Sequence, residues 1–404
     1  MKILLLSFYY PPEVAPGAFR TAALVNSLLR QVDAHSSIEV ITAMPNRFST
    51  YKCCANEYEE YPQVKIHRIY LPHHKTGMID QSFAFLEYAR KVLLKVKKKK
   101  YALIIATSAR LMTGALGAYI SRKNNIPLYL DIRDIFTDTI KDVMINKGAL
   151  YFKYFFSMIE HYTITSAVKV NLVSKGFRSY FTSRYPNQSY SYFTNGIDNE
   201  FLDAISVKDV VKSSSRKQGL VNDVLIVLYA GNFGEGQGLH LIIPELANQL
   251  YGKVKFRLIG DGGRRVLLEK SLYSARCRNV EILPPIPRDQ LILEYERADV
   301  LFMHLNKYNA FEKVLPSKLF EYGSMGKPIW AGVRGYAAEF LKAEMDNVTI
   351  FRSCDVSDAI SSFQTLNLSC NARERFIKKY SRTTIMDLMA TEILSISMQS
   401  NDYK

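Results

Sequence analysis

Cysteine is scarce in this sequence, and its pattern argues against a disulfide framework. The chain has five cysteines in 404 residues, and no two of them form a C-x-x-C pair. An odd number of cysteines without such a pair is not typical of a set of structural disulfides. We therefore expect a reducing, cytoplasmic compartment. The five thiols are Cys53, Cys54, Cys277, Cys354 and Cys370.

Long apolar runs are also missing. A membrane-spanning helix needs a stretch of about 18 uninterrupted apolar residues, and none occurs. The first ten residues include a short apolar run, but Pro11, Pro12 and Glu13 follow where a signal peptide would have small residues. We interpret the N-terminus as a first β-strand, and we expect any contact with a membrane to be peripheral.

Several catalytic signatures are absent. There is no G-x-x-x-x-G-K-[ST] motif, and the glycines at 231–238 do not have G-x-G-x-x-G in register. Neither a P-loop NTPase nor a simple dehydrogenase is therefore indicated. H-E-x-x-H and G-x-S-x-G are missing as well, which removes the main evidence for a metal hydrolase or a serine hydrolase. We predict no metal site.

The composition is that of a folded, water-soluble chain of two domains. Hydrophobic residues make up 48% of the sequence and charged residues 23%, which excludes both disorder and a polytopic membrane protein. A single hydrophobic core usually stops growing below 404 residues, so two domains of about 200 residues each are expected.

Short apolar segments alternate with helical patterns along the whole chain. Such alternation predicts right-handed βαβ units and a mostly parallel sheet, and the pattern starts again in the second half. The fold class is therefore α/β with two doubly wound, Rossmann-like domains. Helices are expected at about 21–30, before the lysines at 97–100, at about 113–123 and in 372–399. The predicted strands are 2–8, 37–43, 64–70, 101–107, 127–134, 168–173, 223–231, 254–262, 279–285, 299–305 and 327–332.

The composition also suggests where the domains divide. The segment from Ile205 to Asp223 is rich in Ser and Lys and has no aromatic residue, which is typical of a linker. We predict a first domain at 1–200, a linker at 201–222 and a second domain at 223–375. A C-terminal helical segment at 376–404 is expected to cross back to the first domain.

Four turns follow predicted strands or precede predicted helices, where ligands bind in open α/β sheets. They are 11–20, 231–238, 260–263 and 315–323. Glycine-rich turns at the carboxyl ends of strands allow backbone N–H groups to approach a phosphate. In the last turn Lys318 and Glu321 lie three residues apart, so both face one side of a helix start. A nucleotide or another phosphate ligand is the leading hypothesis.

The order of the motifs resembles that of the bacterial family-four glycosyltransferases of the GT-B fold, over nearly the whole chain. It is most similar to the O-antigen and capsule branch that includes N-acetyl-L-fucosamine transferases. The matching segments are YYPPEVAPGAFRTAALVNSL, DIRD, VSKGF, NGID, YAGNFGEGQGL, RLIGDGG, VLPSKLFEYGSMGKPI and YSRTTIMDLMATEIL.

The resemblance implies an enzyme that moves a sugar from a nucleotide-sugar to an acceptor with retention of configuration, without a metal or a cofactor. It implies two domains that face each other across a cleft, a UDP-linked N-acetylated aminosugar as donor and a lipid-linked glycan as acceptor. Departure of a nucleoside diphosphate builds negative charge, which N–H groups, helix dipoles and cations stabilise.

The expected donor site lies in the second domain. In the family, a Glu at the position of Glu321 accepts hydrogen bonds from the donor ribose, and Lys318 is the best cation for the phosphates. Gly17 is expected to approach the phosphate or the transferred sugar with its backbone, so the catalytic candidates are Gly17, Lys318 and Glu321. The donor-binding candidates are Gly231, Asn232, Gly234, Gly236, Gln237, Gly260, Gly262, Pro316, Ser317, Lys318 and Glu321.

The sequence departs from the family at the phosphate clamp. Many members have an Arg and a Lys where this chain has Asn232 and Gln237, so Arg110, Arg264 or Arg265 would have to assist Lys318. The acceptor-side candidates are Arg20, Ser108, Arg110, Asp131, Arg133 and Asp134. For the DIRD segment, a buried Arg–Asp pair that fixes the loop is an equally good interpretation. His161, His240 and His304 have no partner spacing, and structural roles are expected for them.

The charge is unevenly distributed. Of a net charge of +15, residues 1–200 hold 26 basic and 15 acidic residues, and residues 90–100 hold seven basic residues and no acid. Apolar residues at 86, 89, 93 and 96 would form one helix face beside these cations. Such a helix is typical of contact with an anionic bilayer, here on the inner face of the plasma membrane. The alternative is a solvated face of a helix packed on its own sheet. No nucleic-acid motif accompanies the charge. The proposed membrane contacts are Lys97, Lys98, Lys99 and Lys100.

Two other functions stay open from the sequence. One is a nucleotide-sugar epimerase of the same fold, and the other is a non-catalytic, membrane-docked scaffold that has lost the phosphate clamp.

Overall fold

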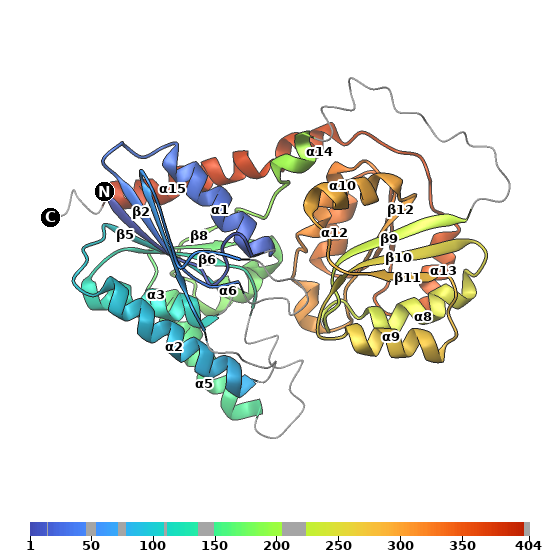
Figure 1. The fold of residues 1–404 in the computed structure, drawn as a ribbon, viewed down its shortest axis with the longest axis horizontal. Helices are drawn as coiled ribbons and strands as arrows, with labels where there is room; N and C mark the ends of the chain where they lie inside the picture. Colours follow the sequence, from blue (N-terminus) through green and yellow to red (C-terminus); the bar gives the residue numbers. More distant parts are fainter. Residues whose placement is uncertain are drawn as a thin grey trace. The chain divides into compact units, whose positions relative to one another are not determined.

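The computed structural model describes residues 1–13, 15–45, 54–71, 78–108, 111–135, 149–203 and 224–399 (Figure 1). The chain divides into two compact units. The first comprises Met1–Asn195 and Thr383–Lys404, and the second comprises Gly196–Arg382. The chain therefore passes between the units twice, at 195/196 and at 382/383. Most of the linker predicted at 201–222 lies outside the described residues.

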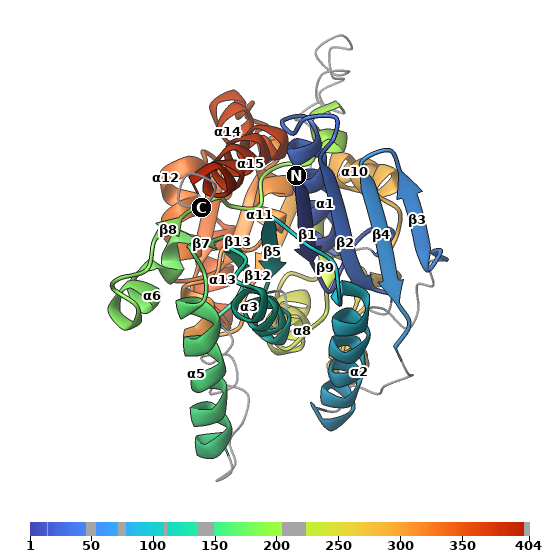
Figure 2. The same ribbon diagram turned by 90° about the vertical axis from the view of Figure 1, so that its left-hand side faces the viewer.

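The described part of the first unit contains a sheet of eight strands in the order β3-β4-β2-β1-β5-β6-β7-β8. All neighbours are parallel except β3 and β4. Figure 2 shows β5, β1, β2, β4 and β3 side by side. The central strand β1 is apolar and almost completely buried, as expected for a strand covered on both faces. The strands are β1 (Lys2–Leu6), β2 (Ser37–Ala43), β3 (Tyr58–Tyr61), β4 (Val64–Ile69), β5 (Leu103–Thr107), β6 (Leu128–Ile132), β7 (Lys169–Leu172) and β8 (Tyr190–Ser191).

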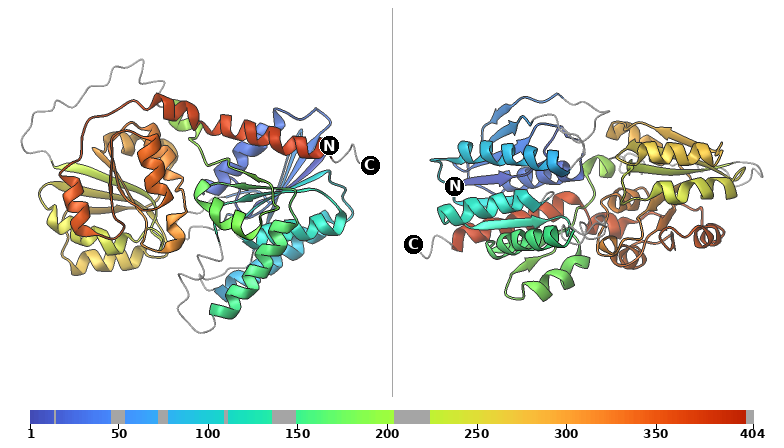
Figure 3. Two further views of the ribbon diagram at one scale, coloured as in Figure 1. Left: turned by 180° about the vertical axis from the view of Figure 1, so that it is seen from behind. Right: turned by 90° about the horizontal axis from the view of Figure 1, so that it is seen from below.

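Helices cover both faces of this sheet. The first and last helices, α1 and α15, lie on one face, and α2, α3 and α5 lie on the other (Figures 1 and 3). Helix α15 packs on its own unit through Tyr129, whose hydroxyl donates to Glu392 over 3.0 Å. The helices are α1 (Pro16–Leu29), α2 (Met78–Val96), α3 (Leu111–Asn124), α5 (Ala149–Thr165), η1 (Lys175–Phe177), α6 (Arg178–Arg184) and α15 (Arg382–Gln399).

Helix α1 begins earlier than the sequence pattern predicts. A start near Thr21 was expected, but the helix begins at Pro16. Proline is well suited to the first helical position because its missing N–H would have no partner there and its φ is already helical. Gly17 and Arg20 therefore belong to a helix and not to an open turn after β1.

Helix α2 packs on the sheet mainly through side chains outside the apolar face that was expected to contact a bilayer. The buried side chains are Ala84, Phe85, Tyr88, Val92 and Val96, spaced at three and four residues as in a helix on a sheet. Of the residues expected on one apolar face, 86, 89, 93 and 96, Val96 is buried whereas Leu86 is 61% exposed. The exposed face carries Phe83, Leu86 and Leu94.

The second unit contains a fully parallel sheet of six strands among the described residues, in the order β11-β10-β9-β12-β13-β14. Its core centres on Trp330, whose indole N–H donates to Ser362 over 2.9 Å. Helices α8 and α9 lie on one face, and α10 and α12 lie on the other (Figure 1). The strands are β9 (Leu225–Asn232), β10 (Val254–Asp261), β11 (Val280–Leu283), β12 (Val300–His304), β13 (Ile329–Gly332) and β14 (Val348–Phe351). The helices are α8 (Leu239–Gln249), α9 (Arg265–Ser274), α10 (Arg288–Arg297), η2 (Asn309–Glu312), α11 (Lys318–Ser324), α12 (Tyr336–Glu344), α13 (Val356–Phe363) and α14 (Glu374–Lys379).

The predicted parallel α/β class is confirmed in both units. The strands that the apolar pattern did not predict are short or only partly buried. β3 is largely exposed, β8 has two residues, and β14 is only partly buried at the end of its sheet. Within the described ranges, no helix combines the length and the apolar character that crossing a bilayer requires.

Candidate functional site

The carboxyl ends of β9 and β10 approach each other so closely that only glycine fits. A Cβ on Gly260 would lie 1.8 Å from the carbonyl oxygen of Gly231, and one on Gly262 would lie 2.5 Å from Oδ1 of Asn232. Gly231 has a φ of +145°, and a Cβ there would lie 2.9 Å from Nζ of Lys318. These glycines bring two strand ends and a lysine together at one edge of the sheet.

The turn after β9 is closed by two side-chain amides, those of Asn232 and Gln237. Asn232 Nδ2 donates to Oε1 of Gln237 over 3.1 Å, and the backbone N–H of Gly234 donates to the same oxygen over 3.2 Å. A Cβ on Gly236 would lie 2.7 Å from the ring of Phe311. The amides therefore bind one another and shape the turn.

The two arginines expected to assist are already paired. Arg264 donates to the carboxylate of Glu235, and Arg265 Nε donates to Glu269 over 2.9 Å. Arg110 lies outside the described residues. Lys318 is therefore the main cation at this edge in the described part of the second unit.

Lys318 has an unusual environment for a lysine. It opens helix α11, directly after Pro316 and Ser317, and its Nζ lies 3.5 Å from the centre of the Tyr229 ring. Among the described residues this buried Nζ has no hydrogen-bond partner. Burial lowers the pKa of Lys318 to about 7, while the charge of Glu321 acts in the opposite direction. An anion at this edge would supply the missing partner.

Glu321, one helical turn further along, belongs to a buried polar cluster. Its Oε2 accepts a hydrogen bond from the hydroxyl of Tyr295 over 2.9 Å, and its Oε1 lies 3.8 Å from Nη2 of Arg288. Burial raises the pKa of Glu321, and the Arg288 guanidinium opposes that rise. The carboxylate side chain keeps 20% exposure, so part of it can still reach a ligand.

Arg288 also binds Asp198, which lies beside the two segments where the chain passes between the units. Asp198 accepts from Arg288 and pairs with Arg382. Arg382 donates through Nη2 to the carbonyl oxygen of Gly196 over 3.1 Å. Sequence reasoning did not single out Arg288 or Tyr295, because no local motif marks them.

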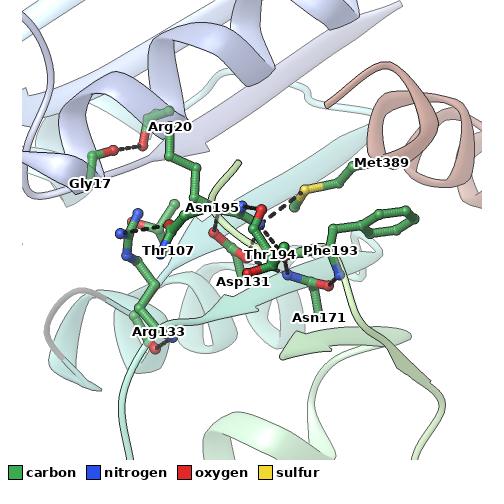
Figure 4. Close-up of polar contacts among 12 residues, drawn as sticks. Gly17, Arg20, Thr107, Asp131, Arg133, Asn171, Phe193, Thr194, Asn195 and Met389 are labelled. Carbon is green, nitrogen blue, oxygen red and sulfur yellow. Dashed lines mark hydrogen bonds and ion pairs between the residues drawn. The ribbon is translucent and has the colours of Figure 1, made fainter. Parts of the chain in front are cut away.

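The acceptor-side candidates Arg20 and Asp131 form a buried ion pair (Figure 4). Arg20 donates through Nε and Nη2 to the two carboxylate oxygens of Asp131, over 2.8 and 2.9 Å. Asn171 Nδ2 donates to the same carboxylate over 2.7 Å. Both charged side chains are about 1% exposed, so they are not accessible to an acceptor. The buried pair that was the alternative for the DIRD segment thus forms, but Asp131 makes it with Arg20, which lies outside that segment.

The pair holds parts of the first unit together. Arg20 also donates to the carbonyl oxygen of Phe193 over 2.9 Å and contacts the sulfur of Met389. Burial alone would raise the pKa of Asp131, but Arg20 holds it below its usual value. The carboxylate thus stays charged inside the unit.

The other first-unit candidates lie near one another. The Ser108 hydroxyl accepts from the backbone N–H of Arg133 over 3.2 Å, and a Cβ on Gly17 would lie 3.4 Å from Nη1 of Arg133. Arg133 is partly buried, and Asp134 is exposed. Gly17, Ser108 and Arg133 therefore form one group.

Of the three single histidines, His304 has hydrogen bonds that give it a structural role. His304 is fully buried, its Nδ1 lies 2.6 Å from the carbonyl oxygen of Gln237, and its Nε2 accepts from the N–H of Cys354 over 2.9 Å. Burial lowers its pKa to about 4, so the ring is neutral at neutral pH. In the described residues, no group of three or more His, Cys, Asp or Glu side chains could hold a metal ion.

Comparisons with known proteins find similarity to glycosyltransferases. Residues 211–382, which include the β9 turn, Lys318 and Glu321, match the family model of the Glycosyl transferases group 1. A protein of Escherichia coli named as a colanic acid biosynthesis glycosyl transferase, WcaI, is 30% identical over 166 residues. The alignment covers 41% of this chain and 38% of that protein, so it spans well under half of the relative's length.

Solved structures of other proteins are similar to this chain over all or nearly all of its length. A sucrose-phosphate synthase from Thermosynechococcus elongatus superimposes with a TM-score of 0.72 at 16% identity, over 100% of both chains. Anabaena HepE in complex with UDP-glucose gives a TM-score of 0.66 at 17% identity, over 98% of this chain and 99% of that one. The chain has the GT-B fold.

The GT-B prediction is thus confirmed, and the family match supports the prediction of a glycosyltransferase. The narrower likeness to the N-acetyl-L-fucosamine branch stays a prediction. Within the GT-B fold, the carboxyl edge of the second sheet is where the glycine turns, Lys318 and Glu321 meet.

Proposed function

We propose that this protein is a retaining, metal-independent glycosyltransferase. It moves an N-acetylated aminosugar from a UDP-sugar to a lipid-linked glycan acceptor in the synthesis of a surface polysaccharide. The observation that carries the proposal is the position of Lys318: a buried ammonium without a hydrogen-bond partner in the described residues, against glycine turns and one helical turn from Glu321.

The chemistry follows from these groups. When the bond between the sugar and the diphosphate breaks, negative charge builds on the diphosphate, and the Lys318 ammonium stabilises it. The turns at 231–238 and 260–263 connect the carboxyl ends of β9 and β10 to the N-termini of α8 and α9, where backbone N–H groups can bind phosphate oxygens. Glu321 can accept hydrogen bonds from the two ribose hydroxyls with its carboxylate oxygens. No cofactor is needed, since the nucleotide-sugar supplies the leaving group.

A UDP-linked donor is supported by a solved relative and by the motifs. HepE of Anabaena was solved in complex with UDP-glucose, and WcaI of Escherichia coli is named for colanic acid biosynthesis. The match to the Glycosyl transferases group 1 favours a transferase over the epimerase alternative. The prediction that Gly17 contacts the donor stays a prediction.

The membrane part of the proposal is supported by helix α2. Phe83, Leu86 and Leu94 are each more than half exposed on this helix, and Lys97, Lys98 and Lys100 are exposed directly after it. Apolar side chains that enter the headgroup region beside cations that attract anionic lipid are typical of a peripheral helix. We place the protein on the inner face of the plasma membrane, where a lipid-linked acceptor would be presented.

Replacing Glu321 by Ala tests the donor site. We expect UDP to bind about 10- to 100-fold more weakly, because a hydrogen bond to a charged group contributes roughly 1.5–3 kcal/mol. Isothermal titration calorimetry measures the affinity, and release of UDP from a UDP-sugar measures turnover. Glu339→Ala, which removes an exposed carboxylate on α12, is the matched control and should bind UDP as the wild type does. Equal UDP affinity in Glu321→Ala and wild type would contradict the site, and tight UDP binding without turnover would favour the scaffold.

A further inference from the structure

Arg288 occupies the centre of a buried charge cluster that no sequence motif marks. It is the first residue of α10 and is largely buried, with 18% of its side chain exposed. Its guanidinium binds the carboxylate of Asp198, lies 3.8 Å from Glu321 and donates to Glu200 over 3.4 Å. One cation is thus shared between the proposed ribose-binding carboxylate and two further acids.

We propose that Arg288 is a positioning residue for Glu321, and that through Asp198 it ties this carboxylate to the paired segments at which the chain enters and leaves the second unit. The proposal rests on the proposed function, since it assumes that Glu321 binds the nucleotide.

The paired segments are well defined. Ile197 and Ser381 form a parallel bridge, in which the N–H of Ile197 donates to Tyr380 over 2.7 Å and the N–H of Arg382 donates to Ile197 over 2.8 Å. Asp198 follows this bridge directly, accepts a hydrogen bond from Arg288 and forms an ion pair with Arg382. The carboxylate of Glu321 is therefore linked to this bridge through two ion-paired residues, Arg288 and Asp198.

The charges around Glu321 come from three elements. Arg288 and Tyr295 face it from α10, Lys318 and Tyr322 lie on its own helix α11, and Asp198 and Arg382 approach from the paired segments. Asp198 is a like charge that disfavours ionisation of Glu321, and Arg288 is the cation that pairs with this carboxylate, over 3.8 Å. Removing Arg288 leaves a buried acid beside another acid, so Glu321 takes up a proton at a higher pH.

A protonated Glu321 accepts hydrogen bonds from a ribose less well, so loss of Arg288 should make the UDP affinity depend on pH. The measured quantity is the ratio of UDP dissociation constants, Arg288→Met over wild type, at pH values from 6.0 to 8.5. We expect about a tenfold ratio at pH 6.0 that falls to about twofold at pH 8.5, because one pKa unit corresponds to a tenfold change. The ratio cancels effects that other titrating groups exert on both proteins.

Three variants complete the experiment. Arg288→Lys keeps the charge and should give a ratio that changes little with pH. Arg297→Met removes an exposed arginine of the same helix and should give a ratio of about one at every pH. Arg288→Met combined with Glu321→Gln should lose the pH dependence, because the titrating group is gone. Circular dichroism verifies folding, and Arg288→Gln replaces the Met variant where that one does not fold.

A folded Arg288→Met or Arg288→Gln protein whose ratio does not change with pH would overturn the inference, as would a pH dependence that survives Glu321→Gln. Failure of the proposed function has a different signature, because wild type would then not bind UDP, or Glu321→Ala would bind it equally well.

Discussion

At the scale of single residues, the proposed anion site of the second unit is built around one lysine, Lys318. Tyr229 offers its ring face to the ammonium, and Gly231 leaves the space that a side chain would fill. A cation over an aromatic face is stabilised without being neutralised, so the lysine keeps its capacity to bind an anion. Arg264 and Arg265, which follow the β10 turn, are both paired with acids. The proposed contact with the phosphates therefore rests on Lys318.

The lowered pKa of Lys318, about 7, predicts that UDP affinity depends on pH. A bound diphosphate favours the charged lysine, so binding above pH 7 requires uptake of a proton and the affinity falls as pH rises. The fall should approach about tenfold per pH unit towards pH 9. Calorimetry in buffers of different ionisation enthalpy measures both the affinity and the proton uptake. Lys318→Met should bind weakly and without the slope, and a slope that persists in this variant would assign the titration to another group.

At the scale of elements, the lysines at 97–100, which follow helix α2, have two different roles. Lys99 is held by the buried carboxylate of Glu39, over 2.6 Å, together with Lys2 and the hydroxyl of Tyr101. Burial alone would raise the pKa of Glu39, but hydrogen bonds from His67 and the lysines hold it well below its usual value. Lys99 thus fastens the end of the helix to β2, and it is not a free membrane contact.

We expect the combined change of Lys97, Lys98 and Lys100 to Gln to reduce binding to phosphatidylglycerol vesicles on the order of 100-fold at low ionic strength, since each cation contributes about 1 kcal/mol. The reduction should be smaller in high salt, because the Debye length shortens. Vesicle sedimentation measures the binding.

The single variant Lys99→Gln is the matched control. It should retain vesicle binding to within about fivefold but lower the melting temperature by about 2–4 °C, because it breaks the contact with Glu39. Equal pelleting of wild type and the triple variant at low ionic strength would show that the three lysines are only a solvated helix face.

At the scale of the whole molecule, the two passages of the chain between the units are paired with each other. Gly196 has a φ of +76°, and a Cβ there would lie 2.8 Å from Cα of Arg382. Left-handed backbone and close approach of a second segment both require glycine at this position.

Gly196→Ala should therefore destabilise the protein by more than a change at an equally left-handed but open glycine. Gly252, with a φ of +78° and nothing within 4 Å of a built Cβ, is the matched control. We expect a loss of about 1 kcal/mol for Gly252→Ala from backbone strain alone, and about 2–4 kcal/mol for Gly196→Ala, where strain and steric overlap add. Urea unfolding measures both variants, and equal losses would show that the paired segments adjust to a side chain at no further cost.

Three features could be predicted from the sequence alone: the parallel α/β organisation of both units, the glycine turns at the strand ends and the adjacency of Lys318 and Glu321. These features depend on local information: the two-residue and 3.6-residue periods of apolar side chains, the turn preferences of glycine, and the three-residue spacing along one helix. The sequence also indicated the GT-B fold, through the order of motifs that the comparisons then supported.

Tertiary packing determines which charged side chains are paired inside the protein and which are left to bind a ligand. Arg20 and Asp131 are 111 residues apart, and Arg288 and Asp198 are 90 residues apart, so no local pattern could pair them. The same holds for Lys99, which looks like its neighbouring lysines until β2 brings Glu39 beside it. A charged residue has the same intrinsic character wherever it stands in a sequence, but its partner, burial and pKa are set by the elements that pack against it.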